Sequence, residues 1–330
     1  MKRRINMANL TLASFFAGIG GIDLGFKQAN VKCVWANEID EYCAETYRAN
    51  NKGVNLLVED ICSVSAKDIP TVDILAGGFP CQPFSVAGHR KGFDDDRGNL
   101  FFQISRILRE LKEENRLPKV VFLENVKNLF NHDNGKTYKH IKDELSDIGY
   151  TVEQNILNTC EYGNLPQNRE RIYIIGFLDK KMANAFNWPK PIELTNKLNK
   201  VICWNDKVSS KYYYNANMKC YELLKSNVVN TDVIYQFRRV YVRENKSGLC
   251  PTLTANMGMG GHNVPIIKDT YGNIRKLTPR ECLNIQGFPK NFVIPKDLCD
   301  SRVYKQAGNS VSVNVIKRIA EEIVSVINNG

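Results

Sequence analysis

The chain has 330 residues, enough for about two domains of ordinary size. Hydrophobic residues make up 43% of it and charged residues 24%, which is ordinary globular composition and argues against a largely disordered chain. No apolar run reaches the roughly 18 residues of a membrane helix, and the apolar stretch after the basic start is too brief for a signal peptide. Ten cysteines without a CxxC pair predict reduced thiols and a cytoplasmic location.

The net charge of +10 is unevenly distributed along the chain. Residues 1–180 carry 23 basic and 24 acidic side chains, a net charge of −1, whereas residues 181–330 carry 22 and 11, a net charge of +11. A near-neutral first half joined to a basic second half predicts that the second half binds a polyanion.

In chain order, the first half alternates apolar strands with amphipathic helices. We expect strands at residues 12–16, 31–36, 72–76, 120–123, 149–157 and 171–178. Helices are expected after the glycines near residue 20, at 41–50 and at 100–111. This alternation predicts a parallel sheet covered by helices on both faces. Ligands of such sheets bind beyond the carboxyl ends of the strands.

The second half is less regular. Residues 186–275 are rich in Asn, Tyr and Lys and show no helical period, so we expect a smaller domain of short strands and loops there. Apolar side chains recur at helical spacing from Val311 to Ile327, which predicts a final helix packed on a core.

The first expected strand runs into a glycine turn, Phe16-Ala-Gly-Ile-Gly-Gly21. Glycines permit a tight turn and close approach of a ligand, and the amides at a helix start favour electron-rich groups. Glu38, after the second strand, is placed to accept hydrogen bonds from ribose hydroxyls, and Asp60 follows a third apolar segment. The ordered trio predicts a nucleoside cofactor. Because the turn lacks the full GxGxxG pattern, both S-adenosylmethionine and NAD remain open.

Cys81 follows another expected strand, within Gly78-Phe-Pro-Cys-Gln-Pro-Phe-Ser85. None of the four histidines has a useful spacing to it, so a Cys nucleophile here must attack a group that another acid activates. Glu124 ends the next strand and is a candidate for that acid. Arg169 and Arg171 suit a carbonyl or phosphate oxygen. The structural alternatives are a buried thiol, a helix-capping acid and surface ion pairs.

Together these residues resemble the DNA (cytosine-5)-methyltransferases of the compact bacterial type that accompanies restriction enzymes. The shared motifs occur in the family's order along nearly the whole chain: FAGIGG, NEID, GGFPCQPFS, LENV, QNRERIYIIGF, RKLTPRECLNIQGFP and QAGNSVSVNV. The resemblance implies an α/β fold, with the Rossmann-like, mostly parallel sheet of S-adenosylmethionine-dependent methyltransferases and a smaller, irregular target-recognition domain. It implies a catalytic and cofactor-binding domain at 1–182 plus 302–330 and a target-recognition domain at 183–301.

The resemblance also implies a covalent mechanism. Cys81 would add to carbon 6 of cytosine while Glu124 holds or protonates ring nitrogen 3. Arg171 would hydrogen-bond the base carbonyl, with Arg169 supporting the same wall. Carbon 5 would then take the methyl group from S-adenosylmethionine, and loss of its proton would expel Cys81. Because this carbon is inaccessible in a duplex, the base must be flipped out.

By the same resemblance, residues near the strand ends and a segment close to the C-terminus bind the cofactor. Glu38 would hold the ribose, Asp60 the adenine, and Pro80 would lie beside the methyl group. The expected cofactor residues are Phe16, Gly18, Ile19, Gly20, Gly21, Glu38, Ile39, Asp60, Ile61, Gly78, Pro80, Asn309 and Ser310. Two positions depart from the family's pattern: Glu59 stands where Gly is usual, and Ser14 stands where Asp is common.

DNA contacts are expected from a lid and from the target-recognition domain. Residues 85–98 would close over the flipped base, with Arg97 on a phosphate. Arginines read guanine edges in the major groove, and the Thr-Leu-Thr element at 252–254 resembles the family's loop next to the bases. The expected DNA-binding residues are Ser85, Arg97, Arg238, Arg239, Arg243, Thr252 and Thr254.

We therefore expect a sequence-specific DNA methyltransferase that forms 5-methylcytosine in double-stranded DNA, with S-adenosylmethionine as cofactor and no metal. We expect a monomer that is the modification half of a restriction-modification system, whose restriction endonuclease acts on the same site without binding the chain. A tRNA cytosine-5 methyltransferase is the first alternative, because it shares the Pro-Cys-Gln and Glu-Asn-Val core. A dinucleotide-dependent dehydrogenase and a catalytically inactive DNA-binding relative are the others.

Overall fold

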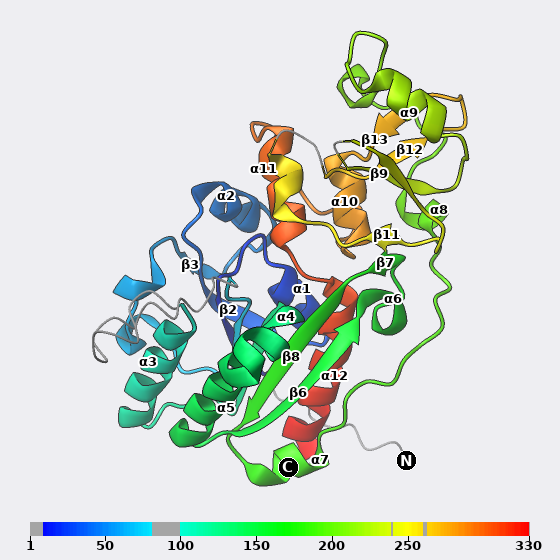
Figure 1. The fold of residues 1–330 in the computed structure, drawn as a ribbon. Coiled ribbons are helices and arrows are strands. Elements are labelled where there is room, and N and C mark those ends of the chain that lie inside the picture. Colours follow the sequence, from blue (N-terminus) through cyan, green and yellow to red (C-terminus); the bar gives the residue numbers. More distant parts are fainter. Residues whose placement is uncertain (1–8, 81–99, 239, 260–262, 330) are drawn as a thin grey trace, which may run out of the picture. The chain divides into compact units, whose positions relative to one another are not determined.

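The structure, a computed structural model, describes residues 9–80, 100–238, 240–259 and 263–329. It divides into two compact units (Figure 1). Unit 1 comprises residues 1–157, 170–189 and 316–330, and unit 2 comprises residues 158–169 and 190–315. Contacts within the units thus assign residues 302–315 to unit 2. The functional division at 182 and 302 stays a prediction.

Unit 1 is built on a seven-stranded sheet with the order β3-β2-β1-β4-β5-β8-β6. β1 to β5 pair in parallel, and β8 is antiparallel to β5. Only residues 159–169 connect β6 to its neighbour β8, which is too short for the crossover that parallel neighbours need. This explains the one departure from a fully parallel sheet. The strands are β1 (Thr11–Phe15), β2 (Lys32–Asn37), β3 (Asn55–Leu57), β4 (Ile74–Gly77), β5 (Val120–Val126), β6 (Thr151–Asn158) and β8 (Glu170–Phe177).

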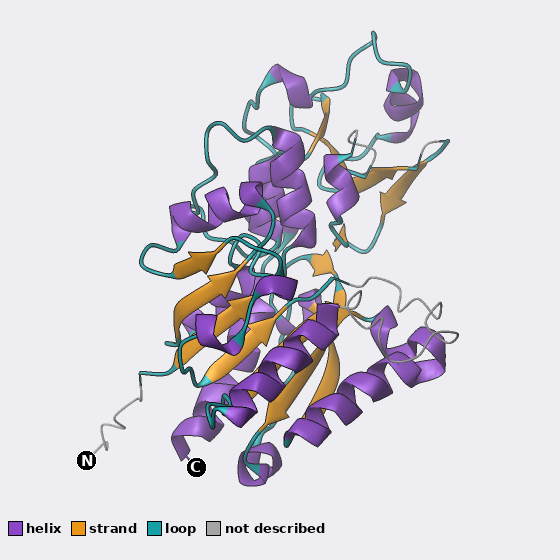
Figure 2. Cartoon of the chain, turned by 90° about the vertical axis from the view of Figure 1, so that its left-hand side faces the viewer, coloured by secondary structure: helices purple, strands orange, loops and turns teal. Residues whose placement is uncertain are grey.

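Helices cover both faces of this sheet (Figure 2). They are α1 (Gly21–Gln28), α2 (Glu41–Asn50), α3 (Leu100–Glu113), α4 (Asn128–Asn131), α5 (Lys136–Ile148), α7 (Lys180–Ala185) and α12 (Val313–Asn329). On one face, α3 and α5 share a core with strand residues such as Trp35 and Leu123. On the other face, the ring of Phe26 in α1 packs edge-on against Phe122 in β5, with centroids 5.3 Å apart. Successive strand residues point to opposite faces, so Phe122 and Leu123 belong to different layers.

The C-terminal helix packs against the first helix within unit 1. A Cβ at Gly25 of α1 would lie 2.5 Å from the side chain of Ile316 in α12, so only glycine permits this approach. Ile319 and Ile323 of α12 are fully buried. These are among the residues whose spacing predicts the final helix.

Unit 2 contains a four-stranded sheet with the order β10-β9-β12-β13 and a two-stranded sheet of β11 and β7. Its strands are β7 (Gln167–Asn168), β9 (Ile234–Phe237), β10 (Val242–Asn245), β11 (Cys250–Pro251), β12 (Ile266–Lys268) and β13 (Ile274–Lys276). Its helices are α6 (Thr159–Tyr162), α8 (Leu198–Val201), α9 (Tyr221–Asn227), α10 (Pro279–Ile285) and α11 (Asp300–Asn309). The sequence shows no helical period in this region because its helices are short: α8 has four residues and α9 has seven.

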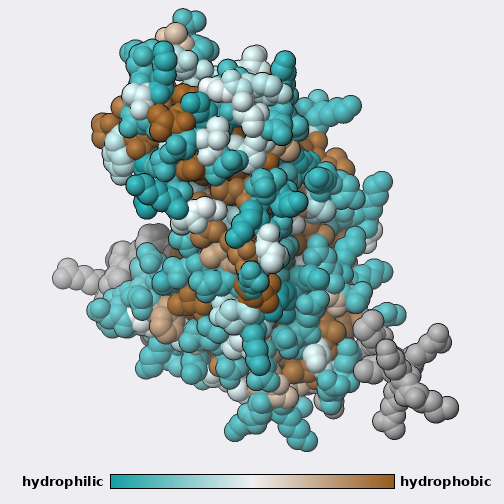
Figure 3. Space-filling view, turned by 90° about the vertical axis from the view of Figure 1, so that its right-hand side faces the viewer, coloured by the Kyte–Doolittle hydropathy of each residue, from teal (hydrophilic) through white to brown (hydrophobic). Residues whose placement is uncertain are grey.

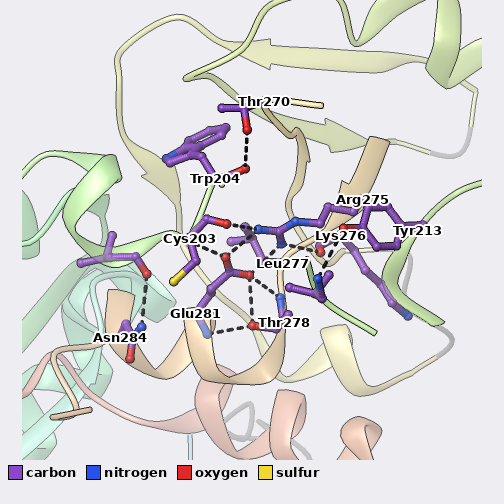
Figure 4. A network of polar contacts seen from close by, with 12 residues as sticks. Cys203, Trp204, Tyr213, Thr270, Arg275, Lys276, Leu277, Thr278, Glu281 and Asn284 are labelled. Carbon is purple, nitrogen blue, oxygen red and sulfur yellow. Dashed lines mark hydrogen bonds and ion pairs between the residues drawn. The ribbon is translucent and has the colours of Figure 1, made fainter. Parts of the chain in front are cut away.

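A buried ion pair joins β13 to α10 in unit 2 (Figure 4). Arg275 Nη1 and Nη2 each donate to one carboxylate oxygen of Glu281, at 2.8 Å. Thr278 and Glu281 form the capping box that begins α10, and the amide of Cys203 donates to Glu281 Oε1 at 2.9 Å. Burial alone would lower the pKa of Arg275, but the bonds to Glu281 outweigh it and hold that pKa above its usual value. Arg275 is therefore charged.

Hydrophilic residues dominate the surface seen in Figure 3, where hydrophobic residues occur in small groups. Among the helices in the described ranges, none is long and apolar enough to cross a membrane. The described residues also include no group of three or more His, Cys, Asp or Glu side chains that could hold a metal ion.

Candidate active site

The order in which strands are added to the unit 1 sheet reverses between β1 and β4. β2 and β3 lie on one side of β1, whereas β4 and β5 lie on the other. Open α/β sheets bind ligands outside the carboxyl ends of the strands at such a switch point. The two strands pair at their ends, Phe15 with Gly77. The glycine turn after β1 and Gly78 after β4 therefore lie at this edge of the sheet.

The turn after β1 holds an unusual backbone conformation. Phe16, Gly18 and Gly20 have positive φ angles of 52°, 56° and 85°. A bulky residue such as Phe16 reaches this region only at an energetic cost, which the surrounding contacts must impose. Ala17 N donates to Asn37 O at 3.0 Å, and Gly20 N donates to Ala17 O at 2.8 Å, so hydrogen bonds to β2 and within the turn fix it. The predicted residues Ile19, Gly20 and Gly21 are buried.

Glu38, directly after β2, is bonded to this turn. Its Oε2 accepts from Gly18 N at 2.7 Å, and its Oε1 accepts from the amides of Ile39 and Asp40 at 2.9 and 2.8 Å. A carboxylate has about four acceptor positions. Three of them are used, which leaves one on Oε2 for a ligand hydroxyl. Ile39 beside it is 59% exposed and offers an apolar surface.

Asp60 follows β3 and is exposed, while the next residue, Ile61, is buried. Asp60 Oδ1 accepts from Cys62 N at 2.9 Å. Asn37, the last residue of β2, links this segment to the turn, because its side-chain amide donates to Glu59 O at 2.8 Å. The sequence prediction missed Asn37, although a polar residue that ends an apolar strand was a visible signal.

Glu124 in β5 and Arg171 in β8 form a pair inside unit 1. Arg171 Nε lies 3.2 Å from Glu124 Oε1, and the two side chains are only 13% and 10% exposed. Despite this distance, the buried Oε1 of Glu124 has no well-formed hydrogen bond among the described residues. An oxygen that is ion-paired but accepts no hydrogen bond from the described residues can take one from a ligand. A Cβ at Gly78 would lie 3.7 Å from Glu124 Oε2, so the end of β4 adjoins the pair.

Asn125, next to Glu124, holds the segment that leads toward Cys81. Its side-chain amide is buried and donates to Phe79 O at 2.8 Å. Pro80 follows and is exposed. The sequence prediction used the Glu-Asn-Val motif without giving Asn125 a role. The predicted residues Cys81, Ser85, Arg97 and Arg239 lie outside the described residues.

Arg169 belongs to unit 2, where backbone carbonyls bind its guanidinium. Nη1 donates to Leu253 O at 2.9 Å and to Gly308 O at 3.5 Å, and Nη2 donates to Ser310 O. Arg169 is 2% exposed. In contrast to Arg171, it is committed to holding two distant segments of unit 2 together.

The Thr-Leu-Thr element packs on α11 within unit 2. Thr252 Oγ1 donates to Asn168 O at 2.7 Å, and Thr254 is exposed. A Cβ at Gly308 would lie 2.1 Å from the carbonyl carbon of Thr254, so only glycine allows this packing. Asn309, which ends α11, is exposed and Ser310 is buried. Their cofactor contact stays a prediction.

β9 and β10 form a hairpin whose two faces differ in chemistry. One face packs into a hydrophobic cluster with Leu224 of α9; its members are Tyr235, Phe237 and Val242. On the other face Gln236 lies opposite Arg243, and Arg238 N donates to Tyr241 O at 2.8 Å to close the loop. Alternation along the strands places Arg238 and Tyr241 on the face of Gln236 and Arg243. Arg238, Tyr241 and Arg243 are exposed, and Arg238 Nη2 donates to Gln236 Oε1 at 3.2 Å.

The strand order, the antiparallel β8, the glycine turn and the acids after β2 and β3 define the class of S-adenosylmethionine-dependent methyltransferases. More narrowly, the chain belongs to the C-5 cytosine-specific DNA methylase family, whose profile matches residues 10–325. It is 51% identical over 318 residues to the type II methyltransferase M.Bsp6I of Bacillus sp. (strain RFL6), which covers 95% of this chain and 98% of that protein. It is 42% identical over 316 residues to M.HaeII of Haemophilus aegyptius, covering 95% and 92%. A DNMT2 mutant from Spodoptera frugiperda has the same fold, with a TM-score of 0.73, 21% identity and coverage of 95% and 99%.

Family membership confirms the predicted fold class and activity. The chain is an enzyme that methylates carbon 5 of cytosine in DNA, with S-adenosylmethionine as the methyl donor. The dinucleotide-dependent dehydrogenase alternative is wrong.

Proposed function

We propose that this enzyme methylates a flipped-out cytosine through a covalent Cys81 adduct, with Glu124 and Arg171 holding the base. The observation that carries the proposal is the buried Glu124 Oε1, which lies next to the Arg171 guanidinium and accepts no hydrogen bond from the described residues. A cytosine ring presents a matching edge, because its nitrogen 3 can share a proton with a carboxyl group and its carbonyl oxygen accepts from a guanidinium. Asn125, through its bond to Phe79 O, positions the segment that carries the nucleophile.

The bond changes follow from these roles. The Cys81 thiolate forms a bond to carbon 6, and the displaced electron pair moves into the ring, where Glu124 supplies a proton at nitrogen 3. When bound, S-adenosylmethionine would supply the methyl group as an electrophile for carbon 5 and leave as S-adenosylhomocysteine. A water molecule takes up the carbon 5 proton, and the electron pair of that bond re-forms the double bond to carbon 6. This breaks the bond from sulfur to carbon 6 and regenerates the thiolate, and the nitrogen 3 proton returns to Glu124. Arg171 stabilises the base carbonyl throughout.

The cofactor residues are those of the strand-end edge of unit 1. The remaining acceptor position of Glu38 suits a ribose hydroxyl, and the exposed Ile39 suits one face of an adenine ring. Asp60, exposed after β3, suits the adenine amino group. Phe16 and the glycines supply a backbone that a ligand can approach closely.

The polar face of the β9–β10 hairpin is the proposed base-reading element. A two-stranded ribbon fits the major groove of duplex DNA, and Arg and Gln are the side chains that make paired hydrogen bonds to guanine and adenine edges. Arg238 and Arg243 are the proposed guanine readers, with Gln236 and Tyr241 on the same face. Arg239, outside the described residues, is proposed as a further DNA contact. Thr252 and Thr254 are proposed as further DNA contacts.

The cellular setting is also a proposal. Its support is the likeness to type II methyltransferases. We propose that the chain acts as a monomer in the cytoplasm and protects a site that a separate restriction endonuclease cleaves. That endonuclease would recognise the same DNA sequence without binding this chain.

The test is methyl transfer from labelled S-adenosylmethionine to duplex DNA and, in parallel, to tRNA. We expect label in duplex DNA only, and transfer confined to tRNA would overturn the proposal. Cys81→Ser should abolish transfer but retain DNA binding, whereas Cys299→Ser, at an exposed thiol of unit 2, should retain both. Duplexes carrying 5-fluorocytosine should trap a covalent adduct, because fluorine cannot leave as a proton does. No adduct at an otherwise methylated site would refute the addition step.

A further inference from the structure

A buried polar cluster lies beneath the glycine turn and has no part in the chemistry above. It consists of Asp23 in the first turn of α1, Tyr47 in α2 and Cys33 in β2. Tyr47 Oη donates to Asp23 Oδ2 at 2.6 Å, and Cys33 Sγ lies 3.6 Å from the same hydroxyl. Asp23 is 2% exposed and Tyr47 is fully buried. The cluster thus ties together the two helices and the strand that border the turn.

Tyr47 also contacts the turn itself. A Cβ at Gly20, where φ is +85°, would lie 3.3 Å from Tyr47 Cε2 and 2.6 Å from Asn51 Nδ2. Asn51 Nδ2 in turn donates to Tyr47 O at 3.1 Å. The Gly20 backbone therefore rests on the Tyr47 ring and the Asn51 amide. The Tyr47 hydroxyl, held by Asp23, fixes where that ring lies.

The chemical state of Asp23 suits this role. Burial raises its pKa, which favours the neutral acid, and the interactions with Ser14, Tyr47 and Cys33 oppose that shift only in part. Asp23 Oδ1 and Ser14 Oγ are both buried, and Ser14 is one of the side chains that interact with the Asp23 carboxyl group.

We propose that Asp23 and Tyr47 are positioning residues for S-adenosylmethionine: their hydrogen bond fixes the ring that supports Gly20 and so sets the shape of the cofactor turn. The inference rests on the proposed assignment of this turn to the cofactor. Neither residue touches the cofactor or the reacting atoms. Their effect is on the affinity for the cofactor rather than on the chemical step.

The test removes only the hydroxyl, in Tyr47→Phe, and measures the Kd for S-adenosylmethionine by calorimetry. Loss of one buried hydrogen bond, about 1 kcal/mol, corresponds to a roughly fivefold weaker Kd, while kcat at saturating cofactor and the affinity for DNA change less than twofold. Amide exchange at Gly18 and Gly20 in the cofactor-free enzyme should be faster. Asp23→Leu should reproduce the Kd change without adding to it in the double variant, and Asp23→Asn, which keeps an acceptor oxygen, should restore binding.

Tyr150→Phe is the matched control. Tyr150 Oη also makes a buried hydrogen bond within unit 1, to Pro118 O at 2.9 Å, but it does not contact the turn. We expect it to lower stability without changing the Kd. The positioning role is overturned if Tyr47→Phe keeps the wild-type Kd, or if Tyr150→Phe changes it equally. Glu38→Gln distinguishes failure of the positioning role from failure of the cofactor assignment. If Glu38→Gln weakens cofactor binding and Tyr47→Phe does not, only the positioning role is wrong. If neither variant weakens binding, the assignment of this turn to the cofactor is wrong as well.

Discussion

Replacing Glu281 by Gln tests how strongly the buried ion pair holds β13 to α10 in unit 2. The two Glu281 oxygens accept hydrogen bonds from the Arg275 guanidinium, from Cys203 N and from the backbone and hydroxyl of Thr278. In the Glu281→Gln side chain an NH2 group replaces one of the two oxygens. This NH2 group is a donor and faces the donors that the oxygen had accepted from. The buried Arg275 also loses its counter-charge. Removing one partner of a buried pair costs about 3–5 kcal/mol.

The assay is urea denaturation followed by tryptophan fluorescence, with amide exchange at Cys203 to report on unit 2 locally. We expect the free energy of unfolding to fall by about 3–5 kcal/mol in Glu281→Gln. The control is Glu321→Gln, which breaks an exposed pair with Lys317 in α12 and should cost about 0.3–0.5 kcal/mol. The double change Arg275→Met with Glu281→Leu should recover most of the loss. A Glu281→Gln variant within about 1 kcal/mol of the wild type would refute the reasoning, because two or three of the five donors would then have lost their acceptor without effect.

Other predictions concern the site, the packing and the cofactor turn. Glu124→Gln should slow single-turnover methylation by about 10²–10⁴-fold with little change in cofactor affinity, and a rate within tenfold of wild type would contradict its role. Arg238→Ala should cost about 1–3 kcal/mol of DNA binding and relax specificity at one base pair; competition between duplexes measures this, and a uniform loss across sequences would indicate a phosphate contact instead. Gly308→Ala places a Cβ 2.1 Å from the Thr254 backbone and should lower stability by about 1–3 kcal/mol, so an unchanged melting temperature would be a contrary result. Because burial raises the pKa of Asp23, its stabilising contribution is complete below its usual pKa of 3.8 and is lost as pH rises through the folded-state pKa. Unfolding measured against Asp23→Asn should therefore show the wild type losing relative stability as pH rises above 3.8, and a difference independent of pH would refute the shift.

Local signals explain why much of unit 1 could be predicted. Residues 41–50 form α2 with the predicted bounds, because Asp40 caps the helix through the amides of Tyr42 and Cys43. The apolar strands stand out for a similar reason, since both of their faces are covered. The direction of β8 could not be predicted in this way. It depends on which strand β8 pairs with, and no local pattern records that.

The residues of the candidate site also differ in whether a local signal in the sequence marks them. The sequence singles out Glu38, Glu124 and Arg171 because each adjoins a strand end, where open α/β sheets bind ligands, and their roles stay predictions. The hydrogen bonds of Arg169 to the backbone of unit 2 could not be predicted, because its carbonyl partners Leu253 and Ser310 lie 84 and 141 residues away in the sequence. Two arginines at alternate positions look equivalent in sequence, yet one pairs with an acid and the other binds a backbone framework.

The charge asymmetry acquires a more specific meaning from the hairpin geometry. Residues 181–275 carry 14 basic and 6 acidic side chains, and such an excess produces affinity for any duplex that weakens with salt. Specificity requires something different, namely side chains that reach base edges together. The β9–β10 hairpin meets that requirement, because it places the exposed Arg238 and Arg243 on one face, beside the buried Gln236, while Phe237 and Val242 pack into a hydrophobic cluster on the other face. Experiments should therefore be able to separate the salt-dependent affinity for any duplex from the recognition of a particular base sequence. Arg243→Lys keeps the charge and the salt dependence of binding but loses the bidentate hydrogen-bond geometry of arginine. It should therefore reduce the difference in affinity between the target sequence and other sequences more than it reduces the affinity for any single duplex.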